Sequence, residues 1–572
     1  MSTNMKPAIV DLYPAKAQFL SGEPITAVAN LRNPFAETEH LVLRVKTRYL
    51  NEIDDELEYR IDVPGGSSVD INIAIAAKAA EFSGFGLDAC LFRQGKMIHS
   101  FSSAFDVVSD WRKAIRYGFL CDFRVVDGCG AQDIMSLCKL HINAVQFYDW
   151  IYRHDDYLPP SSKFTDPMGR ELSMDAVKAK VETCRQHGMK AIAYGAVYAA
   201  SAEFYNRHRD WALYDSAGNP CSMAEMFFIM NIAPESPWRR HIIGEYKKAL
   251  TAAGFDGIHM DTYGFPKTAH ARLDGKDRIV HLEDLFPGMI DAARTELAKV
   301  KDDVCLIFNA VGDWPVADVA AAAQDAVYIE VWEPYERYHH LQQLIKWARH
   351  LGKGKPVILA AYLKCFGDPD AAQRVSAEIS ALILTAVIAA NGGCHLLLGE
   401  KNGVLTQGYY VNHASASDDF MKVIRMYYDF MVRYDNILFE KGLTDVSMTH
   451  TGGDNLEYEF GNGYFSTYGE PGKVWVIIRE NPKYKTISLI NLTGASDDRW
   501  NRGQEKPPVV RDINVRVQIE GKVKSVYQAS PDFEMCRPQS LEYTITDGKR
   551  GKVVLARIPM LYVWDLLVVE ME

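Results

Sequence analysis

The sequence predicts a multidomain protein in which a (β/α)8 TIM barrel is flanked by an N-terminal immunoglobulin-like β-sandwich and a C-terminal β-sandwich. Three observations lead to this prediction. The chain of 572 residues is too long for one hydrophobic core, which rarely extends beyond about 250–300 residues. The middle of the chain alternates strand-like and helix-like segments, and both ends carry short strand-like segments. We expect domains at residues 1–108, 109–433 and 434–572.

The N-terminal part reads as all-β. Runs rich in β-branched and aromatic residues occur at Pro24–Leu31, Leu41–Tyr49 and Gly86–Phe92, and turn residues such as Pro64-Gly65-Gly66 separate them. The length and the strand spacing are typical of an immunoglobulin-like sandwich.

From Trp111 onward, short apolar runs alternate with amphipathic helical segments. The runs are Tyr117–Phe123, Ala144–Tyr148, Ala191–Ala196, Gly257–Asp261, Cys305–Asn309, Val327–Val331, Val357–Ala361 and His395–Gly399. The helical segments include Met174–His187, Trp238–Ala253, Phe286–Val300, Tyr338–Leu351 and Ala371–Asn391. A doubly wound sheet gives a similar alternation. The count of eight runs, and the polar residues at their carboxyl ends, favour a barrel.

The chain returns to short strands from about Tyr434. Examples are Val474–Arg479, Thr486–Asn491, Val515–Ile519 and Leu561–Trp564, with Gly, Asn and Pro turns between strands. This pattern predicts a second β-sandwich.

Composition excludes several classes of protein. The net charge of -11 argues against a nucleic-acid partner, because such proteins carry a basic footprint. No stretch of about 18 uninterrupted apolar residues is present, so we expect no transmembrane helix and no membrane partner. Residues Met1–Leu20 lack a continuous secretory h-region. We therefore expect a cytoplasmic protein as the sequence stands, or a secreted one if a leader has been removed.

Barrel enzymes place their active sites at the carboxyl ends of the strands. Asp261 ends the fourth run and Glu330 lies near the end of the sixth, each directly after apolar residues. Glycoside hydrolysis needs two such carboxyl groups, one to protonate the leaving oxygen and one to attack or to activate water. A single Asp or Glu at a strand end is as often a helix cap or an arginine partner. The pair on two strands of one barrel favours catalysis.

Other polar clusters point to no metal or cofactor. His154-Asp155-Asp156 and His339-His340 do not supply the three convergent ligands of a catalytic zinc site. No GxGxxG, Walker or GxSxG pattern occurs. We expect neither a metal nor a cofactor.

The strand-end segments resemble glycoside hydrolase family 66, which contains endo-dextranases and cycloisomaltooligosaccharide glucanotransferases. The segments are Gln146-Phe147-Tyr148-Asp149-Trp150 followed by Arg153-His154, Gly254–Asp261, Tyr328–Trp332 and, near the start, Asp11–Ala17 with Gly22-Glu23. The resemblance implies the three-domain architecture, an α-1,6-glucan or isomaltooligosaccharide substrate, and a retaining double displacement.

The resemblance also implies roles for individual residues. Asp261 is the expected nucleophile, Glu330 the expected acid/base, and Asp149 a further carboxylate near the sugar that is cleaved. Tyr148, His154, Tyr194, Asn231, Asn309 and Trp332 are expected to line the cleft. Glu333 is a rival for the acid. We prefer Glu330 because it follows the apolar run directly, whereas Glu333 precedes Pro334.

Two alternatives to hydrolysis stay open. The family's cyclising members carry a long carbohydrate-binding insertion within the barrel region, and no loop of this chain is long enough to be one. This favours hydrolysis over transfer to cyclic or longer isomaltooligosaccharides. The other alternative is a barrel that binds glucan without cleaving it.

Overall fold

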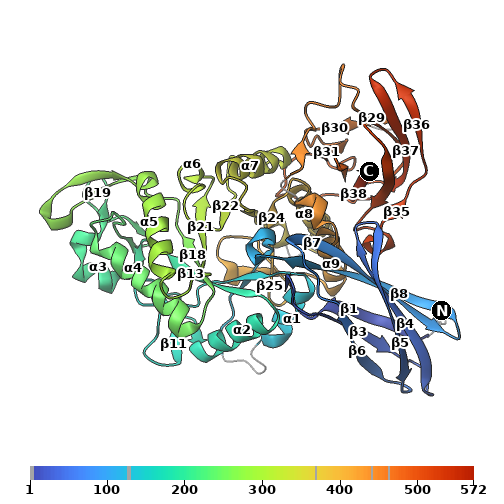
Figure 1. The fold of residues 1–572 in the computed structure, drawn as a ribbon. Coiled ribbons are helices and arrows are strands. Elements are labelled where there is room, and N and C mark those ends of the chain that lie inside the picture. The colour runs from blue at the N-terminus through green and yellow to red at the C-terminus, as the bar shows by residue number, and fades with distance from the viewer. Residues whose placement is uncertain (1–5, 125–129, 368–369, 440–441, 462–463) are drawn as a thin grey trace.

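The computed structural model describes residues 6–124, 130–367, 370–439, 442–461 and 464–572 (Figure 1). The blue strands of the N-terminal part and the red strands of the C-terminal part lie on one side of the molecule in this view. The helices and strands of the middle part lie on the other side.

The N-terminal strands form two sheets that share one apolar core. The strands are β1 (Ala8–Pro14), β2 (Phe19–Leu20), β3 (Ile25–Arg32), β4 (Glu39–Tyr49), β5 (Glu52–Val63), β6 (Ser68–Ile75), β7 (Phe82–Arg93) and β8 (Lys96–Val108). One sheet has the order β1-β3-β6 and the other β2-β8-β7-β4-β5. Alternate residues of both sheets, such as Leu12, Ala29, Leu43 and Leu91, point into the shared core.

The middle of the chain contains a curled, mostly parallel sheet. Its parallel strands are β9 (Tyr117–Leu120), β10 (Ala144–Phe147), β13 (Lys190–Ala196), β18 (Gly257–Asp261), β21 (Cys305–Val311), β22 (Ala326–Glu330), β23 (Val357–Ala360), β24 (Cys394–His395) and β25 (Leu398–Gly399). Each of the eight predicted runs coincides with a strand, the last being split into β24 and β25. Strand β24 pairs with β23, and β25 pairs with β9 at the opposite end of the series. This topology is consistent with a TIM-like domain.

Two separate apolar clusters cover the two faces of this sheet. The inner one includes Phe119, Ile192, Ile307 and Ile358, and the outer one includes the alternate residues, which pack against the helices. Burial on both faces explains why these strands read as continuous apolar runs.

The longer helices are α1 (Ala131–Lys139), α2 (Met174–Gln186), α4 (Pro237–Lys248), α5 (Leu282–Leu297), α7 (Tyr338–Leu351), α8 (Ala371–Ala390) and α9 (Asp418–Arg433); α3 (Ala202–Arg207), α6 (Val316–Val319) and α10 (Asp435–Leu438) are short. Helices α2, α5, α7 and α8 contact strands of this sheet on its outer face, whereas α3, α9 and α10 contact strands of other sheets. Their starts follow local chemistry. Ser173 and Ser417 cap α2 and α9 through their side chains, and Pro237 occupies the first turn of α4.

Helix α8 is long and strongly apolar. Its window Gln373–Ala390 has a mean hydropathy of 1.4, so by length and composition it could span a membrane, contrary to our expectation from the sequence. It is the one helix among the described residues that meets this test. However, 67% of that window is buried inside the protein, where α8 contacts α7, α9 and β32. Burial on several sides accounts for its composition.

Short strands extend the loops after β10, β13, β18 and β25. They are β11 (Lys163–Thr165), β12 (Glu171–Ser173), β14 (Ala199–Ala200), β15 (Leu213–Tyr214), β16 (Ser222–Met223), β17 (Phe227–Ile229), β19 (Thr268–Ala271), β20 (Arg278–His281), β26 (Gly403–Val404) and β27 (Ala414–Ser415). All of these loops follow the carboxyl ends of the parallel strands, so they build the walls around that end of the sheet.

The C-terminal strands also form two sheets around one core. The strands are β28 (Thr444–Asp445), β29 (Tyr458–Gly461), β30 (Phe465–Ser466), β31 (Val474–Glu480), β32 (Tyr484–Asn491), β33 (Val510–Ile519), β34 (Val523–Ala529), β35 (Gln539–Ser540), β36 (Tyr543–Gly548), β37 (Gly551–Leu561) and β38 (Trp564–Met571). Strands β29-β33-β37-β36 form the smaller sheet, and Ile487, Val515 and Leu567 lie in the common core.

Helix α9 joins the three parts. Arg433 forms a bidentate ion pair with Asp88 of β7, at 2.8 and 2.9 Å. On the C-terminal side, the hydroxyl of Tyr427 donates to Asp532 at 2.6 Å. These buried contacts tie both β-rich parts to the same helix.

Candidate active site

A cavity of about 570 Å³ lies at the carboxyl ends of the parallel strands. Eight of the nine predicted site residues line it: Tyr148, Asp149, His154, Tyr194, Asp261, Asn309, Glu330 and Trp332. These residues come from five strand ends and one following loop. The volume of the cavity falls within the range of about 300–1,000 Å³ that ligand-binding cavities occupy.

Strand order places the two candidate catalytic carboxyl groups next to each other. Strand β21 lies between β18, which ends at Asp261, and β22, which ends at Glu330. Asn309 lies on β21, opposite Tyr328 of β22. Side chains alternate between the two faces of a strand. Asp261, Asn309 and Glu330 each come two positions after a residue of the inner face, so their side chains point to that face.

Asn309 connects the two carboxyl groups. Its Nδ2 donates to Oδ1 of Asp261 at 2.7 Å and to Oε2 of Glu330 at 3.1 Å. These two oxygens consequently lie at most 5.8 Å apart, the sum of the two distances. The hydroxyl of Tyr362 donates to the other oxygen of Glu330 at 3.0 Å.

Both carboxyl groups hold their protons more tightly than usual. Burial, and then the charge of Glu330, raise the pKa of Asp261 to about 7, against the hydrogen bonds from Asn309 and Tyr194. Burial also raises the pKa of Glu330, although Asn309 and Tyr362 donate to it. Two close carboxylates resist ionising together, so this pair keeps a proton to higher pH than two isolated carboxyl groups would.

Asp149 stands at another side of the cavity. Its backbone has a φ of 50°, a conformation that is uncommon outside glycine and that clusters at functional sites. Burial raises the pKa of its carboxyl to about 7, while Arg170 lowers it. Arg170 lies 3.8 Å from that carboxyl and donates to the Asp149 carbonyl at 2.9 Å, so it holds this segment in place.

Aromatic rings form much of the remaining wall. Tyr148 stacks on Tyr410 with ring centroids 4.3 Å apart, and it also contacts Tyr194. His154 packs edge-on against Phe227 at 4.3 Å, and burial lowers the pKa of His154 to about 3, which keeps the ring neutral. Such flat apolar faces, interrupted by a few polar groups, suit the faces and hydroxyls of a sugar ring.

Two other sequence candidates lie outside this cavity. Asn231 is fully buried, and its side-chain oxygen accepts from the backbone N–H of Ala233 at 3.0 Å, so its polar group serves the loop that contains it. Glu333, the rival acid, is exposed and lines a neighbouring cavity instead. Of the two rivals, Glu330 alone lines the cavity that contains Asp261.

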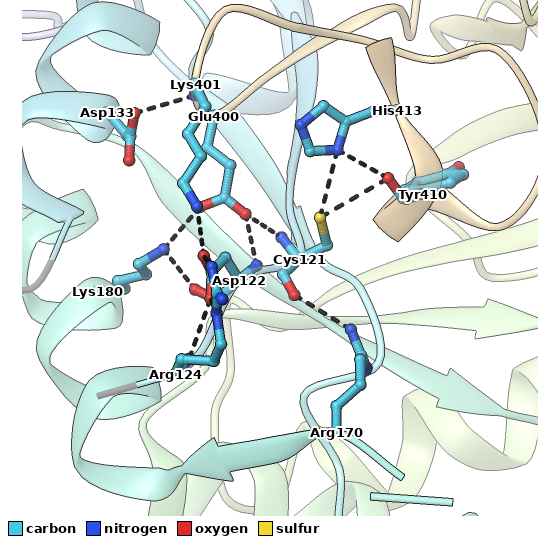
Figure 2. Close-up of polar contacts among 10 residues, drawn as sticks. All are labelled: Cys121, Asp122, Arg124, Asp133, Arg170, Lys180, Glu400, Lys401, Tyr410 and His413. Carbon is cyan, nitrogen blue, oxygen red and sulfur yellow. Dashed lines mark hydrogen bonds and ion pairs between the residues drawn. The ribbon is translucent and has the colours of Figure 1, made fainter. Parts of the chain in front are cut away.

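Glu400, at the end of the eighth run, has a different environment. Its Oε2 lies 2.6 Å from the ammonium of Lys180, and its Oε1 accepts from the backbone N–H of Cys121 at 2.6 Å and of Asp122 at 2.5 Å (Figure 2). Both charged side chains are buried, at 2% and 0% exposure. Glu400 thus fastens the chain after β25 to the end of β9 and to α2.

Groups of three or more metal-ligating side chains do not occur among the described residues. His339 and His340 lie on α7 and contact each other edge-on, with ring centroids 4.4 Å apart, and neither lines the cavity described above.

Several lining residues were not anticipated from the sequence. Tyr362 directly follows the seventh run, so the strand-end rule would have found it. Tyr409 and Tyr410 come from the loop after β26, and Phe227 and Asp166 from the long loops after β13 and β10. No local pattern marks those four residues, because their position depends on how long loops fold back over the sheet.

Comparison with known proteins gives consistent matches along the chain. A family model described as glycosyl hydrolase family 66 matches residues 14–568. A cycloisomaltooligosaccharide glucanotransferase of Niallia circulans is 22% identical over 712 residues, covering 97% of this chain and 71% of that protein. A dextranase of Streptococcus salivarius is 23% identical over 565 residues, covering 84% and 66%.

One solved structure is similar over almost the whole length. It is the crystal structure of a Paenibacillus sp. cycloisomaltooligosaccharide glucanotransferase complexed with cycloisomaltoheptaose. Its TM-score is 0.89 and its sequence identity 20%, with coverage of 98% of this chain and 100% of that one. At this identity the likeness supports the fold.

Proposed function

This chain belongs to glycosyl hydrolase family 66 and is a glycoside hydrolase. We propose that it cleaves α-1,6-glucosidic bonds of dextran or isomaltooligosaccharides with retention of configuration. The substrate class rests on the dextranase and glucanotransferase relatives, whose names refer to such glucans.

The bridge through Asn309 is the observation that carries the mechanism. Retaining enzymes hold their two carboxyl groups about 5–5.5 Å apart, whereas inverting enzymes leave about 6.5–9.5 Å for a water molecule. The upper limit of 5.8 Å between Asp261 and Glu330 oxygens favours the first class.

In the first step, Asp261 attacks the anomeric carbon as a carboxylate. The bond to the glycosidic oxygen breaks, and Glu330 gives its proton to that oxygen, so the leaving chain departs as an alcohol. A glycosyl ester of Asp261 results. In the second step, Glu330, now a carboxylate, takes a proton from water. The water oxygen attacks the same carbon and releases Asp261, so two inversions give net retention.

The remaining cavity residues would position the sugar. Asp149 has a desolvated carboxyl suited to hydroxyl groups of the glucose that is cleaved. Oδ1 of Asn309 and Nδ1 of His154 are buried and have no hydrogen-bond partner among the described residues, and both residues line this cavity. Tyr148, Tyr194 and Trp332 offer aromatic surface and hydrogen-bonding groups. We retain Asn231 as a residue that shapes the loop near this cavity.

Transfer is the second candidate function, because the glucanotransferase relative matches 97% of this chain. Its alignment extends over 712 positions, which is 140 more than the 572 residues available here. At least that many positions of the relative have no counterpart in this chain. We favour hydrolysis over cyclisation because no loop of this chain is long enough for the insertion that the cyclising members carry.

We extend the proposal to the architecture and its boundaries. A (β/α)8 barrel over residues 109–433 is supported by β24 and β25, which pair with opposite ends of the parallel series within one short segment. An immunoglobulin-like sandwich over 1–108 and a C-terminal sandwich over 434–572 are supported by the shared cores of their paired sheets.

The test is incubation with dextran and with isomaltooligosaccharides of defined length, followed by proton NMR and mass spectrometry at early times. The expected products are linear and start as α-anomers. Initial β-anomers would overturn retention, and a majority of cyclic products would overturn hydrolysis. Binding to dextran without new reducing ends would leave only a glucan-binding protein.

A further inference from the structure

A second cavity, of about 400 Å³, adjoins the catalytic one. Trp332 and Tyr362 line both cavities, so the two lie side by side at these rings. The other lining residues are Val331, Glu333, Tyr335, Glu336, Lys364, Arg499, Trp500, Asn501 and Arg502. The rival acid Glu333 is therefore part of a neighbouring surface.

Tyr362 fixes which side of the reaction this second cavity serves. Its hydroxyl donates to Oε1 of Glu330 at 3.0 Å, and the same residue lines the second cavity. Glu330 is the group that protonates the leaving oxygen in the proposed mechanism. A chain that extends from that oxygen past Glu330 would enter the second cavity, whereas Asp149 and His154 lie at the other part of the catalytic cavity.

The wall opposite the sheet comes from the C-terminal part of the chain. Residues 492–509 connect β32 to β33, and Trp500 anchors this loop. Its indole N–H donates to the carbonyl of Tyr335 at 2.7 Å, and its backbone N–H donates to Glu336 at 3.1 Å. Asn501 accepts from the backbone N–H of Lys364 at 2.8 Å. These hydrogen bonds hold the loop at the rim of the cavity.

The side chains in this cavity suit a sugar. Trp332 offers a ring face, with the Lys364 ammonium 5.7 Å from its centroid. Within the described residues, the Arg499 guanidinium and the Glu333 carboxylate have no hydrogen bond or ion pair, so both can bind ligand. The guanidinium only donates and the carboxylate only accepts hydrogen bonds, whereas a sugar hydroxyl can do both, so a hydroxyl can bind either group.

We propose that this cavity is a glucosyl subsite for the leaving-group chain, with Trp332 as platform and Arg499 and Glu333 as hydroxyl partners. The proposal rests on the proposed function. The same subsite would hold an acceptor for transfer. There the acceptor hydroxyl oxygen attacks the anomeric carbon of the Asp261 ester, Glu330 takes the hydroxyl proton, and Asp261 leaves as carboxylate.

The experiment compares Arg499→Ala and Glu333→Gln with Arg511→Ala, an exposed arginine of β33 outside both cavities. Each enzyme is assayed on isomaltooligosaccharides of increasing length and on an aryl α-isomaltoside, whose leaving group carries no sugar. Losing a hydrogen bond to a charged group costs about 1.5–3 kcal/mol, or roughly 10–100-fold in affinity. For Arg499→Ala and Glu333→Gln we expect KM to rise by about tenfold on chains that reach the subsite and by less on the aryl substrate, whose leaving group has no hydroxyl for either side chain. Arg511→Ala should keep the wild-type KM on every substrate.

Two further readouts separate the outcomes. In a Glu330→Gln background, calorimetric binding of long isomaltooligosaccharides should weaken when Arg499→Ala is added, without any turnover. The fraction of transfer products at high substrate should also fall. Identical KM, binding and product patterns in Arg499→Ala, Glu333→Gln and Arg511→Ala would overturn the subsite alone. If the wild-type protein releases no sugar from any isomaltooligosaccharide, the proposed function falls, and the subsite with it.

Discussion

Asn309 donates a hydrogen bond from Nδ2 to Oδ1 of Asp261 at 2.7 Å, and the same nitrogen serves Glu330. An amide nitrogen can only donate, so it favours the charged form of each carboxyl group. It also holds two groups close together that would otherwise repel each other. Asn309 therefore bridges the pair and lowers the pKa of both carboxyl groups, against the effect of burial.

Replacing Asn309 by Leu should keep the volume and remove both hydrogen bonds. The pKa of each carboxyl should rise, because its anion loses a donor, and both limbs of the kcat/KM profile should move to higher pH. We expect kcat to fall by about 10²-fold, as for the loss of one preorganised donor. Tyr362→Phe removes a hydrogen-bond donor from Glu330 only, so it should shift mainly the side of the kcat/KM pH profile that depends on Glu330. If neither variant shifts the pH profile, Asn309 and Tyr362 do not control the pKa values of the pair.

The roles of Asp261 and Glu330 can be separated by the leaving group. An aryl substrate with an acidic phenol needs no proton on departure, so Glu330→Gln should still form the glycosyl-enzyme and accumulate it. Asp261→Asn should lose at least about 10³-fold on every substrate, because no nucleophile remains. Mass spectrometry of the quenched proteins detects the covalent intermediate.

Glu333→Gln is the matched control for the rival acid. It should turn over the aryl substrate like the wild type, since Glu333 lies in the neighbouring cavity. If Glu333→Gln abolishes protonation-dependent cleavage while Glu330→Gln does not, the two roles must be exchanged.

Much of the fold was readable from the sequence because the central strands are buried on both faces. Each predicted run coincides with a strand, and helices α2, α5, α7 and α8 fall within a few residues of their predicted bounds. The positions of Asp261 and Glu330 at the edge of the sheet could be predicted for the same reason, since each ends a strand whose preceding residues are buried. Helix α8 shows the limit of such prediction, because the sequence of an apolar helix is similar whether protein or lipid surrounds the helix.

The rest of the site depends on long-range packing. Tyr410 stacks on Tyr148 from a loop more than two hundred residues away, and no local pattern encodes that contact. Glu400 shows the converse, since it follows a strand just as Asp261 does. The structure places Lys180 beside it, and only that partner identifies an ion pair rather than a catalytic group.

The pH dependence of kcat/KM should be bell-shaped with its optimum below neutrality. Activity needs one proton on the pair. As pH rises through about 7, the value to which burial and Glu330 raise the pKa of Asp261, the pair loses that proton and activity falls. As pH falls, both groups become protonated and the nucleophile is lost. Glu330→Gln should lower the pKa of Asp261, because the neighbouring charge is gone. A flat profile between pH 5 and pH 9 would contradict a shared proton.

Asp149 should contribute mainly through its charge and position. Asp149→Asn keeps the shape and should lower kcat/KM by about 10–100-fold, the loss of one or two charged hydrogen bonds to a sugar. Arg170→Met should raise the pKa of Asp149 further, because Arg170 is the group that lowers it, and should shift the pH profile upward. Arg124→Met, on an exposed arginine that pairs with Asp122, is the control. Equal behaviour of the Arg170 and Arg124 variants would remove Arg170 from this role.

The buried pair of Lys180 and Glu400 makes a prediction about stability. Glu400→Gln leaves the Lys180 ammonium, 2% exposed, with the carbonyl of Asp122 as its remaining acceptor. Breaking such a pair costs about 3–5 kcal/mol, whereas an exposed pair is worth about 1 kcal/mol or less. Lys401→Ala removes an exposed lysine that pairs with Asp122 in the same cluster and serves as the control (Figure 2). Scanning calorimetry should therefore find a much lower unfolding temperature for Glu400→Gln and for Lys180→Met than for Lys401→Ala.

The double variant Lys180→Met/Glu400→Gln buries no unpaired charge, so its loss of unfolding free energy should be smaller than the sum of the losses of the two single variants. Additive losses would mean that the two side chains act separately and that the ion pair does not hold the end of β9 to α2.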